Sequence, residues 1–211
     1  IGKHQNPYSE CNLDYMKNNN ISLVRRLTGG GAVYQDLGNT CWTFVSPKLD
    51  CSNDLQIVTD SLKSLNLNPT LSGRNDILVD NKKVSGVASR RISNNSIHHG
   101  TMLINVNLET LSKCLTVNQT KLESKGIKSV KSRVLNLKEI LPDLTHEKFC
   151  ESIIESFKKN ILDKYGEKCE IEYTDFNQMI SQASVRNRFK QLSAEHWKYY
   201  KSNSKVADLT K

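Results

Sequence analysis

The sequence of 211 residues has no apolar stretch long enough to cross a bilayer, which takes about 20 consecutive apolar residues. Its six cysteines are dispersed and form no C-x-x-C pair, which argues against structural zinc and indicates buried thiols in a reducing compartment. Aromatic residues make up only 7% of the chain, few for a surface that stacks nucleic-acid bases. No Ser-His-Asp order or G-x-S-x-G elbow occurs, so covalent catalysis by the protein is not indicated.

Positive charge and a sufficient apolar content are what the chain does have. Hydrophobic residues make up 37% of it and alternate with polar segments, which predicts a soluble globular domain. The net charge of +8 favours polyanionic partners, among them nucleotides, nucleic acid, anionic membranes and acidic proteins. Charge does not choose among these partners, so a basic nucleic-acid-binding module stays open as an alternative.

The spacing of apolar residues predicts helices and strands without regular βαβ alternation. This pattern is typical of an α+β fold with mixed or antiparallel sheets and packed helices. Helices are predicted from Ser9 to Asn18, from Ser52 or Asn53 to Asn68, from Thr145 to Gly166 and from Asn177 to Tyr200. Strands are predicted as a hairpin over 33–45 with its turn at 36–39, as a second hairpin of 77–79 with 84–88, and at 101–106.

The most informative stretch is 25–44, in which three consecutive glycines follow a basic pair. Glycines cost conformational entropy, so three in a row indicate backbone N–H groups that approach a ligand, or positive φ. Arg25 and Arg26 indicate that this ligand is an anion. A Walker phosphate loop and a dinucleotide fingerprint are both excluded, because the run continues into Ala32, Val33 and Tyr34. A β-bulge or tight hairpin without a ligand is the alternative.

Two polar residues next to predicted strands are further candidates. Asp76 stands at a strand entrance, where a lone carboxylate suits Mg²⁺ that is completed by water and phosphate; a turn residue is the alternative. Lys83 and Ser85 alternate along the next strand, so both are expected to point into one cleft while Val84 packs behind them. An ordinary solvated hairpin lysine is the commoner case.

Two other segments invite a site hypothesis. Adjacent strand residues face opposite sides, so His98 and His99 indicate packing or substrate lining rather than a zinc site. Residues 125–134 are basic and Ser-rich and contain a glycine, which suits a loop that covers a phosphate-bearing ligand. A solvated basic surface or a nucleic-acid patch is the alternative for this segment.

Several long blocks in fixed order resemble the lipoate–protein ligase A family, whose catalytic domain is related to that of biotin ligases. The resembling blocks are 1–12, 25–44, 72–86, 98–108 and 125–142. The resemblance implies an α+β catalytic domain over 1–200, without the strand and helix with which the family domain begins, and a polar tail or linker over 201–211. The chain departs from the family at Gln35, where members often have histidine, and at Trp197, which is all that remains of a Trp-x-Trp element.

The resemblance implies an ATP-dependent enzyme that converts lipoate with Mg²⁺ and ATP into lipoyl-AMP and passes the lipoyl group to a lysine. The implied acceptors are lipoyl domains of 2-oxoacid dehydrogenase acyltransferase subunits and the glycine cleavage H protein, and the enzyme is expected to be a monomer that binds neither nucleic acid nor membrane. An ATP-independent lipoyl or octanoyl transferase with a preactivated donor is the alternative. The Asn- and Lys-rich composition is compatible with a mitochondrial enzyme and equally with one from an AT-rich bacterium. The expected location is the mitochondrion, with a bacterial cytoplasm as the alternative.

Residue roles follow from the same resemblance. Lys83 is implied as the catalytic residue that contacts the lipoyl carbonyl and the α-phosphate, and Asp76 as a ligand of Mg²⁺. The implied ATP-binding residues are Arg26, Gly31, Ala32, Val33, Tyr34, Asp76 and Lys83; the lipoate-binding residues are Arg26, Gly30, Gly31 and Lys83; the loop over the adenylate contains Lys125, Ser129, Val130 and Arg133. Physical reasoning supports fixed cations here, because carboxylate attack on a phosphate must bring two anions together.

Overall fold

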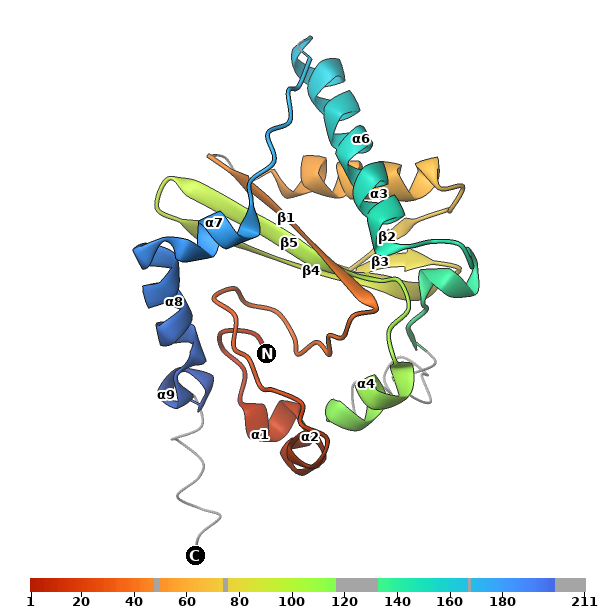
Figure 1. Ribbon diagram of the computed structural model, residues 1–211. Coiled ribbons are helices and arrows are strands. Elements are labelled where there is room, and N and C mark those ends of the chain that lie inside the picture. Colours follow the sequence, from red (N-terminus) through yellow and green to blue (C-terminus); the bar gives the residue numbers. More distant parts are fainter. Residues whose placement is uncertain (48–49, 74–75, 117–132, 167, 200–211) are drawn as a thin grey trace, which may run out of the picture. The chain divides into compact units, whose positions relative to one another are not determined.

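The computed structural model describes residues 1–47, 50–73, 76–116, 133–166 and 168–199 (Figure 1). The chain divides into two compact units. Unit 1 consists of Ile1–Val33, Lys113–Thr116 and Glu170–Lys211, and unit 2 consists of Tyr34–Ser112 and Val117–Cys169. Among the described residues, no helix is both long enough and apolar enough to span a membrane.

Unit 2 is built on a five-stranded antiparallel sheet in the order β1-β5-β4-β3-β2. The strands are β1 Asn39–Ser46, β2 Thr70–Ser72, β3 Asp76–Val79, β4 Lys82–Ile92 and β5 Asn95–Leu103. The predicted β3–β4 hairpin is confirmed: Asp80 and Asn81 have φ of 50° and 60°, the left-handed geometry of a tight two-residue turn. β5 begins six residues before the predicted start, in the hairpin that follows β4.

The first strand of the hairpin predicted over 33–45 is absent from the described residues, so this part of the prediction is wrong. β1 begins only at Asn39 and pairs with β5, and no strand precedes it in the described part of unit 2. The reason is a long-range contact: the carbonyl oxygen of Gly38 accepts hydrogen bonds from the backbone N–H groups of Ile104 and Asn105, at 3.0 and 2.9 Å. These bonds tie the turn to the end of β5 instead of folding it back on residues 33–35.

Two helices, α3 Cys51–Ser64 and α6 His146–Tyr165, pack against one face of this sheet and against each other (Figure 1). Val58 and Leu62 of α3 and Phe149 of α6 are fully buried against apolar side chains of the sheet. An antiparallel sheet covered by helices confirms the predicted α+β class. The 3₁₀ helix η2 Leu137–Glu139 also belongs to unit 2, and α4 Leu108–Cys114 continues from unit 2 into unit 1.

The ends of these helices follow capping chemistry. The prediction for α6 is confirmed: Thr145 Oγ1 accepts from the backbone N–H of Lys148 at 3.2 Å, and Gly166 ends the helix at φ 70°. For α3 the predicted caps are wrong, because Asp50 caps the helix through its carboxylate. α3 also ends earlier than predicted, at a left-handed Asn66 with φ 62°.

Unit 1 contains the short helices α1 Pro7–Glu10, α2 Leu13–Asn18, α7 Phe176–Ser181, α8 Ala183–Ser193 and α9 Glu195–Tyr199. The helix predicted over 9–18 is split because Cys11 is extended and forms a β-bridge with Leu115. The helix predicted over 177–200 is interrupted at Gln182 and Ala194, both extended. Neither glycine nor proline stands at these breaks, so the residues that usually signal the end of a helix are absent there.

Arg25 organises unit 1 from its interior. Its fully buried guanidinium donates hydrogen bonds of 2.6–3.1 Å to backbone carbonyl oxygens in two distant segments, those of Gly2, Lys3, Gln5, Trp197 and Lys198. Trp197 Nε1 donates to the carbonyl of Arg25 at 2.8 Å. The interpretation of Arg25 as an anion ligand is therefore wrong, because the fold itself uses its donors.

Candidate functional site

A β-bulge in β4 decides which side chains reach the candidate site. Ile77 pairs with Ser85, but the next residue, Leu78, pairs with Lys83, so Val84 is the extra residue on β4. Ser85 and Val84 are both fully buried on the side of the helices. The expectation that Lys83 and Ser85 share a cleft is wrong, because the extra residue breaks the two-residue alternation of a strand.

Lys83 and Asp76 meet on the other face of the sheet. Lys83 Nζ lies 2.6 Å from Asp76 Oδ1, and an Nη of Arg133 lies 3.0 Å from Asp76 Oδ2. The three side chains are 28%, 19% and 37% exposed, so a ligand can reach them. Two cations around one carboxylate leave one positive charge in excess, which favours an anionic ligand.

Gly86 provides the space in which the end of Lys83 lies. A methyl group at position 86 would be 2.9 Å from Lys83 Nζ and 3.1 Å from Cε. Gly86 pairs with Asp76 on β3, so the carboxylate stands beside the same bare stretch of backbone. The sequence alone does not reveal a role for Gly86, because its importance depends on the bulge and on the register of β3.

The face that carries Lys83 continues across β5 to β1. Gly86 pairs with Thr101, and Thr101 pairs with Cys41. Gln35 Nε2 donates to Cys41 Sγ at 3.4 Å, and burial of the thiol raises its pKa, although the residue as a whole is exposed. Because Cys41 as a residue is exposed, the prediction of a buried cysteine is wrong at this position, although its thiol is partly desolvated; among the other cysteines, Cys11 and Cys114 are buried.

The glycine loop belongs to unit 1, and Arg26 braces it from within. The Arg26 guanidinium donates to the carbonyl oxygens of Gly29, at 2.6 and 3.1 Å, and of Gly31, at 2.8 Å. Gly30 has φ 89°, the positive φ that the sequence predicts for this run. A Cβ at Gly29 or Gly31 would meet no atom within 4 Å, so packing within the chain does not require these two glycines.

The structure brings three of the predicted site residues together, Asp76, Lys83 and Arg133, all in unit 2. Arg26, Gly30, Gly31, Ala32 and Val33 belong to unit 1, and Tyr34 is the first residue of unit 2. Lys125, Ser129 and Val130 lie outside the described residues.

The donor set around Asp76 limits how a metal ion can be held. Within the ranges that the structure describes, no three His, Cys, Asp or Glu side chains come together as a metal site. Mg²⁺ commonly takes one or two carboxylates and completes its shell with water and substrate phosphates. The Asp76 carboxylate fits that manner of binding, with the other ligands supplied by a nucleotide.

His98 and His99 face opposite sides of β5, as predicted. His98 is 3% exposed, its Nδ1 lies 3.1 Å from Asp54 Oδ2, and its ring meets Trp42 edge-on. Burial raises the pKa of the Asp54 carboxyl, and the hydrogen bond and charge of His98 oppose that rise. His98 therefore packs in the core, as one of the two interpretations predicted, and does not line the Lys83 face.

Known proteins similar to this chain place it in one family. Residues 1–158 match the family model described as the lipoyl protein ligase A/B catalytic domain. A lipoate-protein ligase A from Psychrobacter cryohalolentis is 40% identical over 205 residues, which are 96% of this chain and 60% of the relative. The chain thus spans less than two thirds of that relative.

Solved structures extend this similarity to three dimensions. P. falciparum LipL1 in complex with lipoate has a TM-score of 0.80 at 36% identity, over 94% of this chain and 57% of LipL1. A bi-partite lipoate protein ligase from Thermoplasma acidophilum, described together with its lipoyl domain, has a TM-score of 0.77 at 30% identity, over 95% of this chain and 79% of the archaeal one. A lipoate-protein ligase A bound with ATP has a TM-score of 0.78 at 27% identity, over 95% and 81%.

Proposed function

Because the chain belongs to the lipoyl protein ligase A/B catalytic domain family, we propose that it activates lipoate with ATP and transfers the lipoyl group to a lysine of a lipoyl domain. One observation carries the proposal: Lys83 and Arg133 flank Asp76 on an accessible face, with one positive charge in excess. Joining a carboxylate to a nucleotide requires such a site, since two anions must approach each other.

The first step needs no nucleophile from the protein. A carboxylate oxygen of lipoate attacks the α-phosphorus of ATP, the new O–P bond replaces the bond to the β-phosphate, and pyrophosphate leaves. The charge of Lys83 Nζ offsets the repulsion between the lipoate carboxylate and the α-phosphate. Arg133 holds the Asp76 carboxylate in position beside Lys83. Asp76 would hold Mg²⁺, and the ion would supply further positive charge for the leaving pyrophosphate.

In the second step the lysine amine of the acceptor attacks the acyl carbon. An amide bond forms, the bond between the acyl carbon and the phosphate oxygen breaks, AMP leaves, and the amine loses a proton to solvent. Lys83 serves again in this step, because its ammonium polarises the same carbonyl and stabilises the negative charge that develops on its oxygen.

The acyl chain of lipoate is proposed to follow the face beyond Gly86, over Thr101 and towards Cys41 and Gln35. Support comes from the register, which aligns these residues on the face that carries Lys83. Thr101 is partly buried, and Thr101 and Cys41 are residues without an ionised side chain at neutral pH, so the path suits an apolar chain that ends in sulfur atoms.

The nucleotide is proposed to lie against the glycine loop. Arg26 and the backbone of 31–34 would hold it, and Gly30 and Gly31 would also approach lipoate. Support comes from the open space over Gly29 and Gly31 and from the bracing of their carbonyls by Arg26, which presets the loop before a ligand arrives. The segment that contains Lys125, Ser129 and Val130 is proposed to close over the adenylate, with Arg133 at its end.

The acceptors proposed are lipoyl domains of 2-oxoacid dehydrogenase acyltransferase subunits and the glycine cleavage H protein, and the proposed state of the enzyme is a monomer. The proposed location is the mitochondrion. Support for a lipoyl-domain acceptor comes from the archaeal relative, which is described together with its lipoyl domain. An ATP-independent transferase is the second candidate, since the family includes both ligase A and ligase B types.

The deciding experiment measures AMP and lipoylated product from lipoate, Mg²⁺, ATP and an unmodified lipoyl domain. Lys83→Met is compared with Lys82→Met, a matched control on the neighbouring exposed lysine. We expect Lys83→Met to lower the rate by about 100- to 1000-fold, the effect of removing one preorganised donor, and Lys82→Met to leave it nearly unchanged.

Three other outcomes have distinct meanings. Transfer from synthetic lipoyl-AMP or an octanoyl donor, without any turnover of ATP and lipoate, would identify an ATP-independent transferase. Equal rates for the two lysine variants would overturn the role of Lys83. Inactivity with every donor, together with salt-sensitive binding of polynucleotide, would favour the nucleic-acid-binding alternative.

A further inference from the structure

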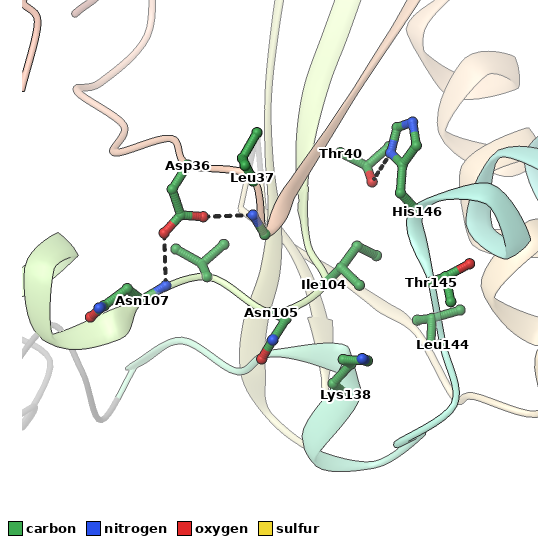
Figure 2. Close-up of a pocket in the computed structure, with 12 residues that line it drawn as sticks. Asp36, Leu37, Thr40, Ile104, Asn105, Asn107, Lys138, Leu144, Thr145 and His146 are labelled. Atoms are coloured by element: carbon green, nitrogen blue, oxygen red, sulfur yellow. Dashed lines mark hydrogen bonds between the residues drawn. The ribbon is translucent and has the colours of Figure 1, made fainter.

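A second concave region of unit 2 has no part in the chemistry proposed above. It is an open groove of about 710 Å³ that we name the Leu37 groove; it is lined by the turn at 36–38, Thr40, residues 104–107, Lys138 and residues 144–146. In Figure 2, Asp36 and Asn107 lie at one end, Thr145 and His146 at the other, and Lys138 between them.

At the first end, a rigid turn presents a fully exposed leucine, Leu37. The Asp36 carboxylate accepts from the backbone N–H of Gly38 at 2.8 Å and from that of Asn107 at 2.9 Å (Figure 2). A methyl group at Gly38 would lie 2.1 Å from the carbonyl oxygen of Asn105, so the turn packs closely on the segment after β5. A single exposed leucine is ordinary, but this one is held in a fixed position beside a groove.

The groove combines an apolar floor with one available cation. Ile104, Val106 and Leu144 are buried beneath it. Within the described residues, the ammonium of Lys138 has no hydrogen-bond or ion-pair partner, whereas both oxygens of Asp36 are occupied by backbone donors. A partner protein can therefore make an apolar contact with Leu37 and an ion pair with Lys138.

A short run of backbone connects the groove with the strand that carries Lys83. The backbone N–H of Leu135 donates to the carbonyl of Lys83, and that of Lys138 donates to the carbonyl of Ile104, each at 3.0 Å. The three Cα–Cα steps from residue 135 to residue 138 span at most about 11 Å. One side of a standard protein interface covers about 800 Å², which is wide enough to extend from the groove to the end of β4 that carries Lys83.

We propose that the Leu37 groove is the docking surface for the lipoyl domain that receives the acyl group, which places an apolar residue against Leu37 and a carboxylate against Lys138. The proposal rests on the proposed function. A folded protein fits better than a small molecule, because small-molecule sites enclose most of their ligand, whereas this groove is open and carries a protruding side chain. The charge of Lys138, in a chain of net charge +8, selects an acidic partner.

Binding is measured first, so that the test does not depend on turnover. An ¹⁵N-labelled unmodified lipoyl domain is titrated with the full-length protein, either unchanged or with Leu37→Ser or Lys138→Glu. Matched controls are Leu71→Ser and Lys159→Glu, an exposed leucine on β2 and an exposed lysine on α6. We expect Kd to rise about tenfold for each groove variant, as for a moderate hot spot, and to stay within about twofold for the controls.

A charge swap and the first half-reaction complete the design. Reversing the matching acidic residue of the lipoyl domain to lysine should restore binding to Lys138→Glu. The rate of pyrophosphate release from lipoate and ATP, without an acceptor, should be the same in all variants. In the two groove variants, only the KM for the lipoyl domain should rise. If the unchanged protein binds the domain but releases no pyrophosphate, the proposed function fails while the docking surface stands.

Two results would overturn the docking proposal itself. One is an unchanged Kd for both groove variants in folded protein. The other is a rise in the KM for ATP or lipoate instead of that for the lipoyl domain, since the groove would then belong to a small-molecule site.

Discussion

Lys83 Nζ lies over the bare backbone of Gly86, in the space that a side chain at position 86 would fill. This relationship joins two residues that a strand without a bulge would turn to opposite faces. It gives Gly86 a positioning role: the missing Cβ lets the ammonium come within 2.6 Å of Asp76.

Gly86→Ala should slow adenylate formation about tenfold or more, because small misplacements of a catalytic group are costly, and should change the melting temperature little. The new methyl group would displace the flexible end of Lys83 from Asp76. Pyrophosphate release measures the effect. Gly100→Ala is the contrasting variant: its methyl group would lie 2.5 Å from the Trp42 ring, so it should lower the free energy of unfolding by about 1–3 kcal/mol. Full activity of a folded Gly86→Ala protein would refute the positioning role.

Arg25→Met should destabilise unit 1. It removes the guanidinium that satisfies buried carbonyls near both ends of the described chain, and the unfolding free energy of unit 1 should fall by at least about 2 kcal/mol. Hydrogen exchange at the helices of unit 1 measures the loss. Arg186→Met, on the exposed face of α8, is the control and should leave the exchange unchanged. Equal protection in the two variants would contradict the structural role of Arg25.

Asp54 should make stability fall as the pH rises. Its folded-state pKa is raised by burial above the unfolded value of about 3.9, so the folded protein holds a proton that the unfolded chain has lost. The resulting stabilisation is complete below the unfolded pKa and disappears as the pH passes upward through the folded pKa. The difference in unfolding free energy between the unchanged protein and Asp54→Asn should therefore decrease as the pH rises above about 4.

Asp60 on the same helix provides a control of opposite sign. Burial acts to raise its pKa, but hydrogen bonds from Lys63 and Gln56 together outweigh burial and lower it. Its contribution is present above the unfolded pKa and is lost as the pH falls through the folded pKa. The same trend in Asp54→Asn and Asp60→Asn would contradict the assignment of the pH dependence to burial of Asp54.

The rate at which Cys41 is alkylated should show whether the acyl chain of lipoate lies beside it. Because burial raises its pKa above the ordinary 9.0, we expect slow alkylation by iodoacetamide at neutral pH and faster alkylation as the pH rises. Saturating lipoate should slow the reaction further, whereas alkylation of Cys51 in α3 should not change. Mass spectrometry of the two peptides measures both rates. Equal protection of both cysteines, or of neither, would argue against the proposed path of the chain.

Local chemistry in the sequence determined several elements correctly. Thr145 and Gly166 mark the ends of α6 because capping depends on neighbouring residues alone. Asp80 and Asn81 form the β3–β4 turn because their side chains tolerate positive φ. The motifs that contain Asp76, Lys83 and Arg133 were selected from the sequence as candidates, and these three side chains meet in the structure, although the distances between them are not encoded in any single motif.

Only the tertiary structure decided the remaining features, because each depends on groups far apart in the chain. Arg25 and Arg26 look alike as a basic pair, but the carbonyls near Trp197 make the first a structural residue. Lys83 and Ser85 lie on opposite faces because the pairing of β3 with β4 contains a bulge, which periodicity does not reveal. Composition and short-range spacing therefore determined the fold class, the turns and the candidate residues, and long-range hydrogen bonding and strand register decided which of those residues are available for chemistry.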